Sequence, residues 1–520
     1  MADIVIINPR FEASFWGMEH ALPLLGKSAN LPVACLPLLA ALTPAEHTVT
    51  LIDENVEPLD YDRIARADVV GLTGMSVQRF RMREILTELK ARNVFTVVGG
   101  PWVTVQEDYF VGLADVIFIG EAEETWPQFL TEWKQGKHAV RYEQADKTDM
   151  SQVPTPRFDL LKMNRYLFGS IQFSRGCPFQ CEFCDIIVTF GRRPRLKTDA
   201  QIIAEMEALR AVGGRVVFIV DDNLIGNKKA IKELLRTLIA WQRANAYPFV
   251  FFTEASLDLA EDKELLQLMV DAHFISVFIG IETPNEKSLK ETKKYQNVRP
   301  AGTILERVHT IQKAGLEVWC GMIVGFDNDD ATIFESQREF ISQAHIVNAM
   351  VGMLHAIPKT PLHARLAAEG RLDPADVSEF GTNVIPKQIA REDLRAGYLR
   401  VMEDLYEPEA YFTRLDTLYL RRKLTTGRSR ERWYKRHPWT YLKAQAANLI
   451  RAGVLFGRLM RSVPDKELRR EYRQRLIRFW MARRDPAMTF NYVVKCAMHY
   501  HHHKMARTMN DGKSAVVNSF

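Results

Sequence analysis

One stretch of the sequence decides its fold: Ser174-Arg175-Gly176-Cys177-Pro178-Phe179-Gln180-Cys181-Glu182-Phe183-Cys184. Three thiolates at this spacing on a short loop can bind three irons of a [4Fe–4S] cube and leave the fourth iron open to an outside ligand. A tetrahedral zinc site would need a fourth Cys or His, and none lies within the loop. We therefore expect Cys177, Cys181 and Cys184 to be metal ligands, with zinc and incidental buried thiols as the alternatives.

Apolar runs surround this loop at intervals that predict a parallel sheet. Between the runs lie helical stretches such as 198–212, 228–245 and 301–315. At least six βα units in this order indicate a partial or full (β/α) barrel, in which functional residues lie at the strand C-termini. The predicted strands are 169–174, 215–220, 249–254, 276–281, 317–324 and 349–356.

An earlier set of apolar runs alternates with helical stretches in the manner of a doubly wound α/β domain. Ligands of such sheets bind at the carboxyl ends of the strands. The overall division that we predict is an N-terminal Rossmann-like domain over 1–140, a Pro-containing linker over 141–165, a barrel over 166–388 and a basic, mainly helical region over 389–520. The predicted strands of the first domain are 3–8, 48–52, 68–73, 94–98 and 115–119.

The C-terminal region has a different charge from the rest of the chain. From Arg414 onward there are 25 Lys and Arg against 7 Asp and Glu, whereas the whole chain carries a net charge of only +5. In the predicted helix 465–484, arginines interleave with apolar residues, which is typical of a basic amphipathic helix. We expect either a solvated face packed on the barrel or a peripheral contact with anionic lipid. No nucleic-acid motif accompanies the basic residues, so no nucleic acid is expected.

Other features of the composition narrow the class of protein. About 47% of residues are hydrophobic and 26% charged, as in a globular protein. Six cysteines in 520 residues do not form a disulfide scaffold, and no apolar stretch is long enough to span a membrane. We expect a cytoplasmic protein, or one held only peripherally at the inner membrane surface, and a disordered tail around His499 and His501-His502-His503.

The cysteine spacing, Phe183 before the last cysteine and the position of the loop after the first barrel strand resemble the radical S-adenosylmethionine (SAM) superfamily. The resemblance implies that SAM binds the open iron of the [4Fe–4S] cluster and is cleaved to a radical that abstracts hydrogen from an unactivated C–H bond. It also implies SAM contacts at strand ends; the alternative for the acids Glu254 and Glu282 is that each simply caps the next helix. The implied SAM contacts are Phe183, Asp221, Asp222, Asn223, Glu254, Glu282 and Gly325.

The domain order is similar to that of the cobalamin-binding class of the same superfamily. Its axial-histidine motif, DxHxxG, is missing, because Asp53-Glu54-Asn55-Val56-Glu57-Pro58 contains no His. The resemblance implies a cobalamin whose lower face has no protein His ligand; the alternative is a Rossmann-like domain that binds no corrin. The implied cobalamin contacts are Thr73, Gly74, Ser76, Gly99, Gly100 and Glu121.

Several longer sequence segments resemble one subgroup, in which a helical domain of unknown function follows the barrel. The nearest characterised relatives in this resemblance are the hopanoid C-2 methylases. The segments include 172–197 and Thr382-Asn383-Val384-Ile385-Pro386. The resemblance implies methyl transfer from cobalamin to a carbon of a lipid or other small molecule, with flavodoxin or ferredoxin as electron donor. Alternatives are an oxidase or cyclase of tetrapyrrole biosynthesis and a non-catalytic cobalamin or redox sensor. The sequence names no catalytic side chain.

Overall fold

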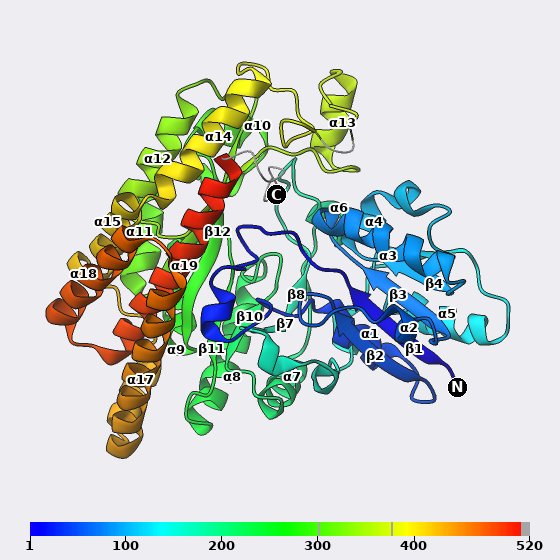
Figure 1. Cartoon of the computed structure of the whole chain (residues 1–520), viewed down its shortest axis with the longest axis horizontal. Coiled ribbons are helices and arrows are strands. Elements are labelled where there is room, and N and C mark those ends of the chain that lie inside the picture. The colour runs from blue at the N-terminus through cyan, green and yellow to red at the C-terminus, as the bar shows by residue number, and fades with distance from the viewer. Residues whose placement is uncertain (300–301, 376–377, 511–520) are drawn as a thin grey trace. The chain divides into compact units, whose positions relative to one another are not determined.

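The structure, a computed structural model, describes residues 1–299, 302–375 and 378–510 (Figure 1). It divides the chain into two compact units. The first comprises Met1–Glu12, Ser28–Gly226 and Ile357–Ala364, and the second comprises Ala13–Lys27, Asn227–Ala356 and the chain from Arg365 onward. The cysteine loop therefore belongs to the same compact unit as the N-terminal sheet.

The N-terminal sheet has six parallel strands in the order β2-β1-β3-β4-β5-β6. The predicted strand–helix alternation is confirmed, and β6 comes from the stretch 141–165 that the sequence predicts to be a linker. The strands are β1 (Asp3–Asn8), β2 (Thr48–Asp53), β3 (Val69–Thr73), β4 (Thr96–Gly99), β5 (Val116–Ile119) and β6 (Arg141–Glu143). The helices between them are α1 (Cys35–Leu42), α2 (Tyr61–Ile64), α3 (Arg79–Ala91), α4 (Pro101–Val105) and α5 (Thr125–Lys134).

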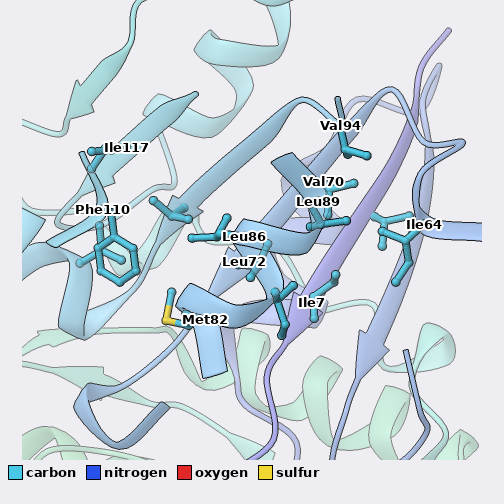
Figure 2. Packing of buried hydrophobic residues seen from close by; sticks show 14 of the residues in the cluster. Ile7, Ile64, Val70, Leu72, Met82, Leu86, Leu89, Val94, Phe110 and Ile117 are labelled. Atoms are coloured by element: carbon cyan, nitrogen blue, oxygen red, sulfur yellow. The ribbon is translucent and has the colours of Figure 1, made fainter. Parts of the chain in front are cut away.

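The core of this unit forms between α3 and the sheet. Met82, Leu86 and Leu89 recur at helical spacing, so they share the face of α3 that meets Ile7 and Leu72 of the strands (Figure 2). All five side chains are almost completely buried. This packing fixes the strands from one side and leaves their carboxyl ends to carry polar residues and glycines.

The second sheet also has six strands, in the order β14-β13-β12-β11-β10-β7, and the pairs β7/β10, β11/β12, β12/β13 and β13/β14 are parallel. The predicted barrel-type sheet is confirmed. Its strands are β7 (Gly169–Ile171), β10 (Val216–Ile219), β11 (Val250–Glu254), β12 (Phe274–Glu282), β13 (Glu317–Val324) and β14 (Ala349–Met353). The larger helices between them are α7 (Asp199–Ala211), α8 (Lys228–Ala244), α9 (Lys263–Asp271), α11 (Ile304–Ala314) and α12 (Ile333–Gln343).

The C-terminal region is helical, as predicted. In the second unit, α14 and α17 both pack against α19. The helices are α14 (Arg391–Tyr406), α15 (Pro408–Asp416), α16 (Arg428–Lys435), α17 (Pro438–Ser462), α18 (Lys466–Arg483) and α19 (Pro486–Asn510). Within the described ranges, no helix is both long and apolar enough to cross a membrane.

The expectation of a disordered tail at the histidine run is wrong. His499, His501, His502 and His503 all lie in α19 and are buried. The run looks polar when it is taken alone, but Tyr492, Val493 and Cys496 precede it on the same helix and are fully buried. The His502 ring stacks on Phe15 of the N-terminal segment, with ring centroids 4.3 Å apart. Neutral imidazoles therefore serve as core side chains.

Candidate functional site

The cysteine loop begins after the short strand β8 (Ser174–Arg175), which pairs antiparallel with β9 (Arg195–Leu196). Gly176 has a φ of +96°, and a Cβ there would lie 2.9 Å from the Arg193 carbonyl oxygen. The Cys177 N–H donates to the Gly191 carbonyl at 3.2 Å. Only glycine fits this turn, which starts the loop close against its return segment.

The three thiols are placed on one short loop, with Cys181 buried and Cys177 and Cys184 half-buried. All six cysteines are in the described part, and none forms a disulfide. No three His, Cys, Asp or Glu side chains among the described residues converge as the ligands of a single metal ion would. A four-iron cube needs each thiolate at a different iron, so this donor set fits a cluster.

The acids after β10 accept hydrogen bonds from the residues that lead into the cysteine loop. Asp221 accepts hydrogen bonds from the Phe173 N–H (2.8 Å) and from the Ser174 N–H (2.8 Å) and hydroxyl (2.6 Å). Asp222 accepts from the Gly176 N–H at 2.7 Å. Burial raises the pKa of Asp221 to about 6 and that of Asp222 to about 7.

Asn223, the next residue, completes this support. Its amide Nδ2 lies 3.9 Å from Cys177 Sγ. The structure thus brings the three residues predicted for SAM after β10 against the cluster loop, and their role toward SAM stays a prediction. Phe183 lies in the loop itself and is half-buried.

A buried ion-pair network ties the carboxyl end of β5 to the cysteine loop. Arg175 contacts Glu121 at 2.7 Å and Glu123 at 2.6 Å, and Arg195 contacts Glu121 at 3.0 Å. Burial raises the pKa of Glu123, but the charge of Arg175 and the hydrogen bonds to Arg175 and Thr148 together outweigh burial, so the net shift of the pKa is downward. Glu121, predicted for cobalamin, is therefore engaged with two arginines whose importance the sequence did not indicate.

Three residues predicted for cobalamin lie together where β3 and β4 end. A Cβ on Gly100 would lie 2.6 Å from Thr73 Oγ1 and 3.0 Å from the Gly74 nitrogen. Gly99 faces Phe118 of β5, and Ser76 begins the short turn Ser76–Gln78. A Cβ on Gly120, after β5, would meet nothing within 4 Å. The backbone at Gly120 is thus open to the approach of a flat macrocycle, which fits cobalamin, whereas Gly99 and Gly100 allow neighbouring strand ends to pack closely.

The position of the missing axial histidine holds a buried polar network instead. Asp53 accepts hydrogen bonds from Tyr166 Oη at 2.8 Å, from Asn8 Nδ2 at 3.1 Å and from Asn55 Nδ2 at 2.7 Å. Burial raises the pKa of Asp53. Because its oxygens are used within the protein, Asp53 is a structural residue of this edge.

In the second unit, Glu282 lies at the end of β12 with a φ of +67°. Its carboxylate forms an ion pair with Lys294 at 2.6 Å and folds back over Gly280, where a Cβ would lie 2.3 Å from Glu282 Oε1. Asn297 donates to the Gly280 and Ile281 carbonyls at 3.0 Å. Glu254 ends β11 and is half-buried. The sequence predicted both acids, whereas Lys294 was missed.

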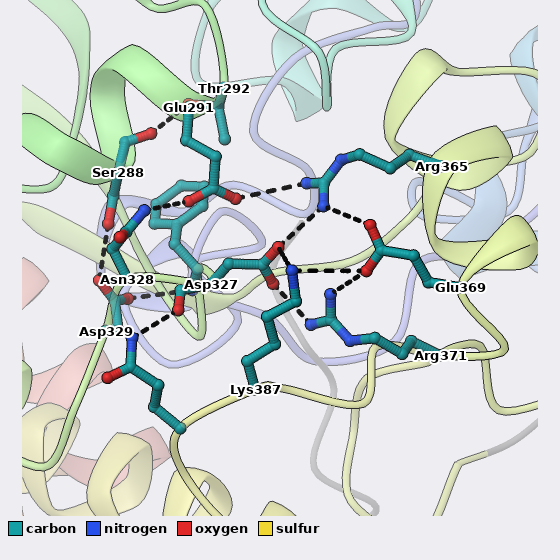
Figure 3. Close-up of polar contacts among 12 residues, drawn as sticks. Ser288, Glu291, Thr292, Asp327, Asn328, Asp329, Arg365, Glu369, Arg371 and Lys387 are labelled. Carbon is teal, nitrogen blue, oxygen red and sulfur yellow. Dashed lines mark hydrogen bonds and ion pairs between the residues drawn. The ribbon is translucent and has the colours of Figure 1, made fainter.

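Gly325 follows β13 and has a φ of +102°. The N–H groups of Gly325 and Phe326 both donate to Asp329 Oδ2 at 3.0 Å, which fixes this turn. Nearby, Asp327 binds Arg365 at 2.8 Å and Arg371 (Figure 3). Burial raises the pKa of Asp327, but the two arginines outweigh burial and lower it. A charged network thus holds the strand end where SAM is predicted to approach the backbone.

Comparisons with known proteins agree with this arrangement. Family models match three consecutive parts of the chain: a B12 binding domain over 30–130, the Radical SAM superfamily over 171–338 and a domain of unknown function, DUF4070, over 360–515. The predicted cofactors, a [4Fe–4S] cluster, SAM and cobalamin, are confirmed by these domains.

Two solved structures share the fold. The radical SAM methyltransferase TsrM from Kitasatospora setae, with cobalamin and a [4Fe–4S] cluster bound, has a TM-score of 0.59 at 16% identity and covers 76% of this chain and 82% of its own. The cobalamin-dependent SAM radical enzyme OxsB has a TM-score of 0.60 at 14% identity and covers 99% of this chain and 81% of its own.

Sequence relatives are considerably closer. A protein of Synechocystis sp. described as an uncharacterized methyltransferase is 38% identical over 96% of this chain and 90% of its own length. The hopanoid C-2 methylase of Rhodopseudomonas palustris is 36% identical over 87% of this chain and 84% of its own. The chain therefore belongs to the cobalamin-dependent radical SAM methyltransferases in which a DUF4070 domain follows the radical SAM domain.

Proposed function

We propose that this methyltransferase methylates an unactivated carbon of a hydrophobic, polycyclic lipid of the hopanoid type. The observation that carries the proposal is a set of aromatic side chains beside Glu254. In register, Glu254 pairs with Phe278 of β12, and Phe278 pairs with Trp319 of β13. The Phe252 ring lies 6.3 Å from Trp319, and the Trp16 ring lies 5.1 Å from Phe278.

The exposure of these strands supports this reading. Along β11, Phe252 and Glu254 are half-buried, whereas Phe251 and Thr253, which alternate with them, are fully buried. One face of the strand therefore packs into the core, and the other presents rings with accessible surface. Large aromatic faces bind flat apolar ring systems through burial and stacking. A fused-ring hydrocarbon suits such a surface better than a charged metabolite does.

The cofactors supply one-electron chemistry and a methyl group when bound, and the protein supplies orientation and exclusion of water. Asp221 and Asp222 hold the cysteine loop, and the aromatic side chains hold the substrate carbon in place. We further propose a small electron-transfer protein such as flavodoxin or ferredoxin as reductant. The methylase of Rhodopseudomonas palustris, 36% identical, supports a hopanoid in preference to a tetrapyrrole, since bacteriochlorophyllide methyltransferases of Chlorobaculum tepidum are 22–24% identical.

The test uses anaerobically reconstituted protein, SAM labelled in its methyl group, a chemical reductant and a pentacyclic hopene. We expect label in the extracted hopene, none with Cys181→Ala, and a raised KM with Trp319→Ala but not with Tyr295→Ala, an exposed aromatic elsewhere. Label in a magnesium porphyrin ester but not in the hopene would overturn the substrate. Altered substrate without label would overturn methylation in favour of an oxidase or cyclase.

A further inference from the structure

The exposed apolar side chains of this protein are concentrated on the C-terminal helices. Among the described residues, thirteen large apolar side chains are exposed, and eight of them lie in α17 or α18. The eight are Trp439, Leu442, Leu449, Ile450, Val454, Ile477, Trp480 and Met481. Five of the eight lie on α17 alone, and several exposed apolar side chains on one helix indicate an interaction surface, whereas single exposed residues do not.

The α17 helix has two apolar sides. Its buried stripe is Ala452, Leu455 and Leu459, which pack inward. With 100° per residue, Trp439 and Ile450 fall on the opposite side of the helix, where a helix of a soluble protein normally carries polar residues, and Leu449 falls between the two sides. We call this exposed side, with Leu442 and Val454, the outer face of α17.

The first half of α17 is less covered than the second half. No residue from 438 to 451 is buried. Figure 1 shows this half extending past the neighbouring helices of the second unit. Trp439 is 79% exposed and Ile450 is 67% exposed, so the outer face is available to a partner.

The charges around the outer face have one sign. The α17 helix contains Lys443, Arg451, Arg458 and Arg461 and no Asp or Glu. Arg458 is used within the protein, since it donates to the Leu24 carbonyl at 3.1 Å, whereas Lys443, Arg451 and Arg461 are exposed. Apolar side chains with tryptophan between cations suit an anionic bilayer interface, and they disfavour self-association, which would bring like charges together.

We propose that the outer face of α17 binds the surface of an anionic phospholipid bilayer. The helix lies in the interface plane, with Trp439, Leu442 and Ile450 among the acyl chains and Lys443 and Arg451 at the phosphates. The helix does not cross the bilayer, because its charged residues recur along its length. The proposal does not rest on the reaction, although such a surface would give the enzyme access to a lipid substrate.

The test is co-sedimentation of the full-length protein with vesicles. One preparation is phosphatidylcholine with one third phosphatidylglycerol, and the other is phosphatidylcholine alone. We expect salt-sensitive binding to the anionic vesicles, about fivefold weaker for each of Lys443→Gln and Arg451→Gln, and at least about tenfold weaker for Ile450→Glu. Val111→Glu and Val140→Glu are matched controls, since both valines are similarly exposed in the first unit.

Three results would overturn the proposal. They are failure of the wild-type protein to bind anionic vesicles, equal binding by Ile450→Glu, and a dimer in solution that Ile450→Glu dissociates, which would assign the face to a second copy of the chain. Cys181→Ala should bind vesicles as the wild type does. Loss of methylation and loss of membrane binding are therefore measured separately.

Discussion

The carboxylate of Asp221 accepts hydrogen bonds from both the backbone N–H and the hydroxyl of Ser174, three residues before Cys177. Asp221→Ala would leave the buried N–H groups of Phe173 and Ser174 without an acceptor, at a cost of about 1–3 kcal/mol for each. We expect the loop to lose its fixed conformation and the purified protein to hold less than half of the wild-type iron.

Iron and sulfide per chain after anaerobic gel filtration measure this effect. Asp108→Ala, a change at an exposed acid of the same unit, is the control and should keep its iron. Full iron content in Asp221→Ala would show that the loop is held by other contacts.

The Arg175 network predicts that a second substitution restores part of the stability that the first one removes. Arg175→Met removes the cation that the buried Glu121 and Glu123 share and leaves Glu121 with Arg195, which should lower the free energy of unfolding by about 3–5 kcal/mol. Adding Glu123→Gln removes one of the two charges, so the double variant should be more stable than Arg175→Met alone.

Thermal unfolding of the three proteins tests this order. Arg92→Met is the control, because Arg92 pairs with Asp62 and Glu88 at the exposed surface, where ion pairs contribute little to stability. A double variant less stable than Arg175→Met would mean that the two carboxylates do not repel each other in the absence of the arginine.

Gly280→Ala should displace the Glu282–Lys294 ion pair, because its Cβ would overlap the Glu282 carboxylate. If Glu282 contacts SAM as predicted, the dissociation constant of SAM should rise at least about tenfold, which equals 1.4 kcal/mol. Equilibrium dialysis with labelled SAM measures it.

Gly457→Ala, within α17, is the matched control for this change, since a Cβ there meets nothing within 4 Å. Unchanged SAM binding in Gly280→Ala, with Glu282→Gln also unchanged, would remove Glu282 from the SAM site.

The buried histidines of α19 make the helical region sensitive to acid. Burial lowers the pKa of His499 and His502 well below 6.5. Below pH 6.5 the unfolded chain binds a proton at each imidazole while the folded chain does not, so stability is full above pH 6.5 and falls as the pH drops. Between about pH 7.5 and about pH 5.5 each should contribute a loss of about 1 kcal/mol.

His502→Phe keeps the stacking on Phe15 and removes one titrating group, so it should reduce this loss. Amide hydrogen exchange of α19 at the two pH values, corrected for intrinsic rates, measures it locally. His437→Phe, at an exposed histidine, is the control variant for the substitution itself. Identical pH dependence in His502→Phe and the wild type would contradict the assignment.

Much of the fold could be predicted from the sequence because its strands are apolar runs that end at glycines or acids. The predicted strands 3–8 and 317–324 match β1 and β13 to the residue. The prediction from the pattern of apolar residues was wrong at α19. The polar histidine run there belongs to a helix that is buried on nearly all sides. There, burial depends on tertiary packing that no local pattern records.

The site was only partly predictable, for a similar reason. The cysteines and the strand-end acids follow local motifs. Arg175 and Glu121, in contrast, lie 54 residues apart and meet only when the sheet and the loop are assembled. The local motif predicts that Glu121 lies at the edge of the sheet where a ligand binds. Whether its carboxylate contacts a ligand or another side chain of the protein depends on contacts from distant parts of the chain.

The pairing of Arg175 with Glu121 also limits where two related enzymes can be joined in a chimera. A chimera that takes residues 1–140 from one relative and the rest from another would bring together a strand end and a cysteine loop that never folded as partners. A crossover after Gly226 would keep both in one inherited block, together with Asp221 and Asp222. In this protein the iron-binding loop is thus best inherited in one piece with the N-terminal sheet.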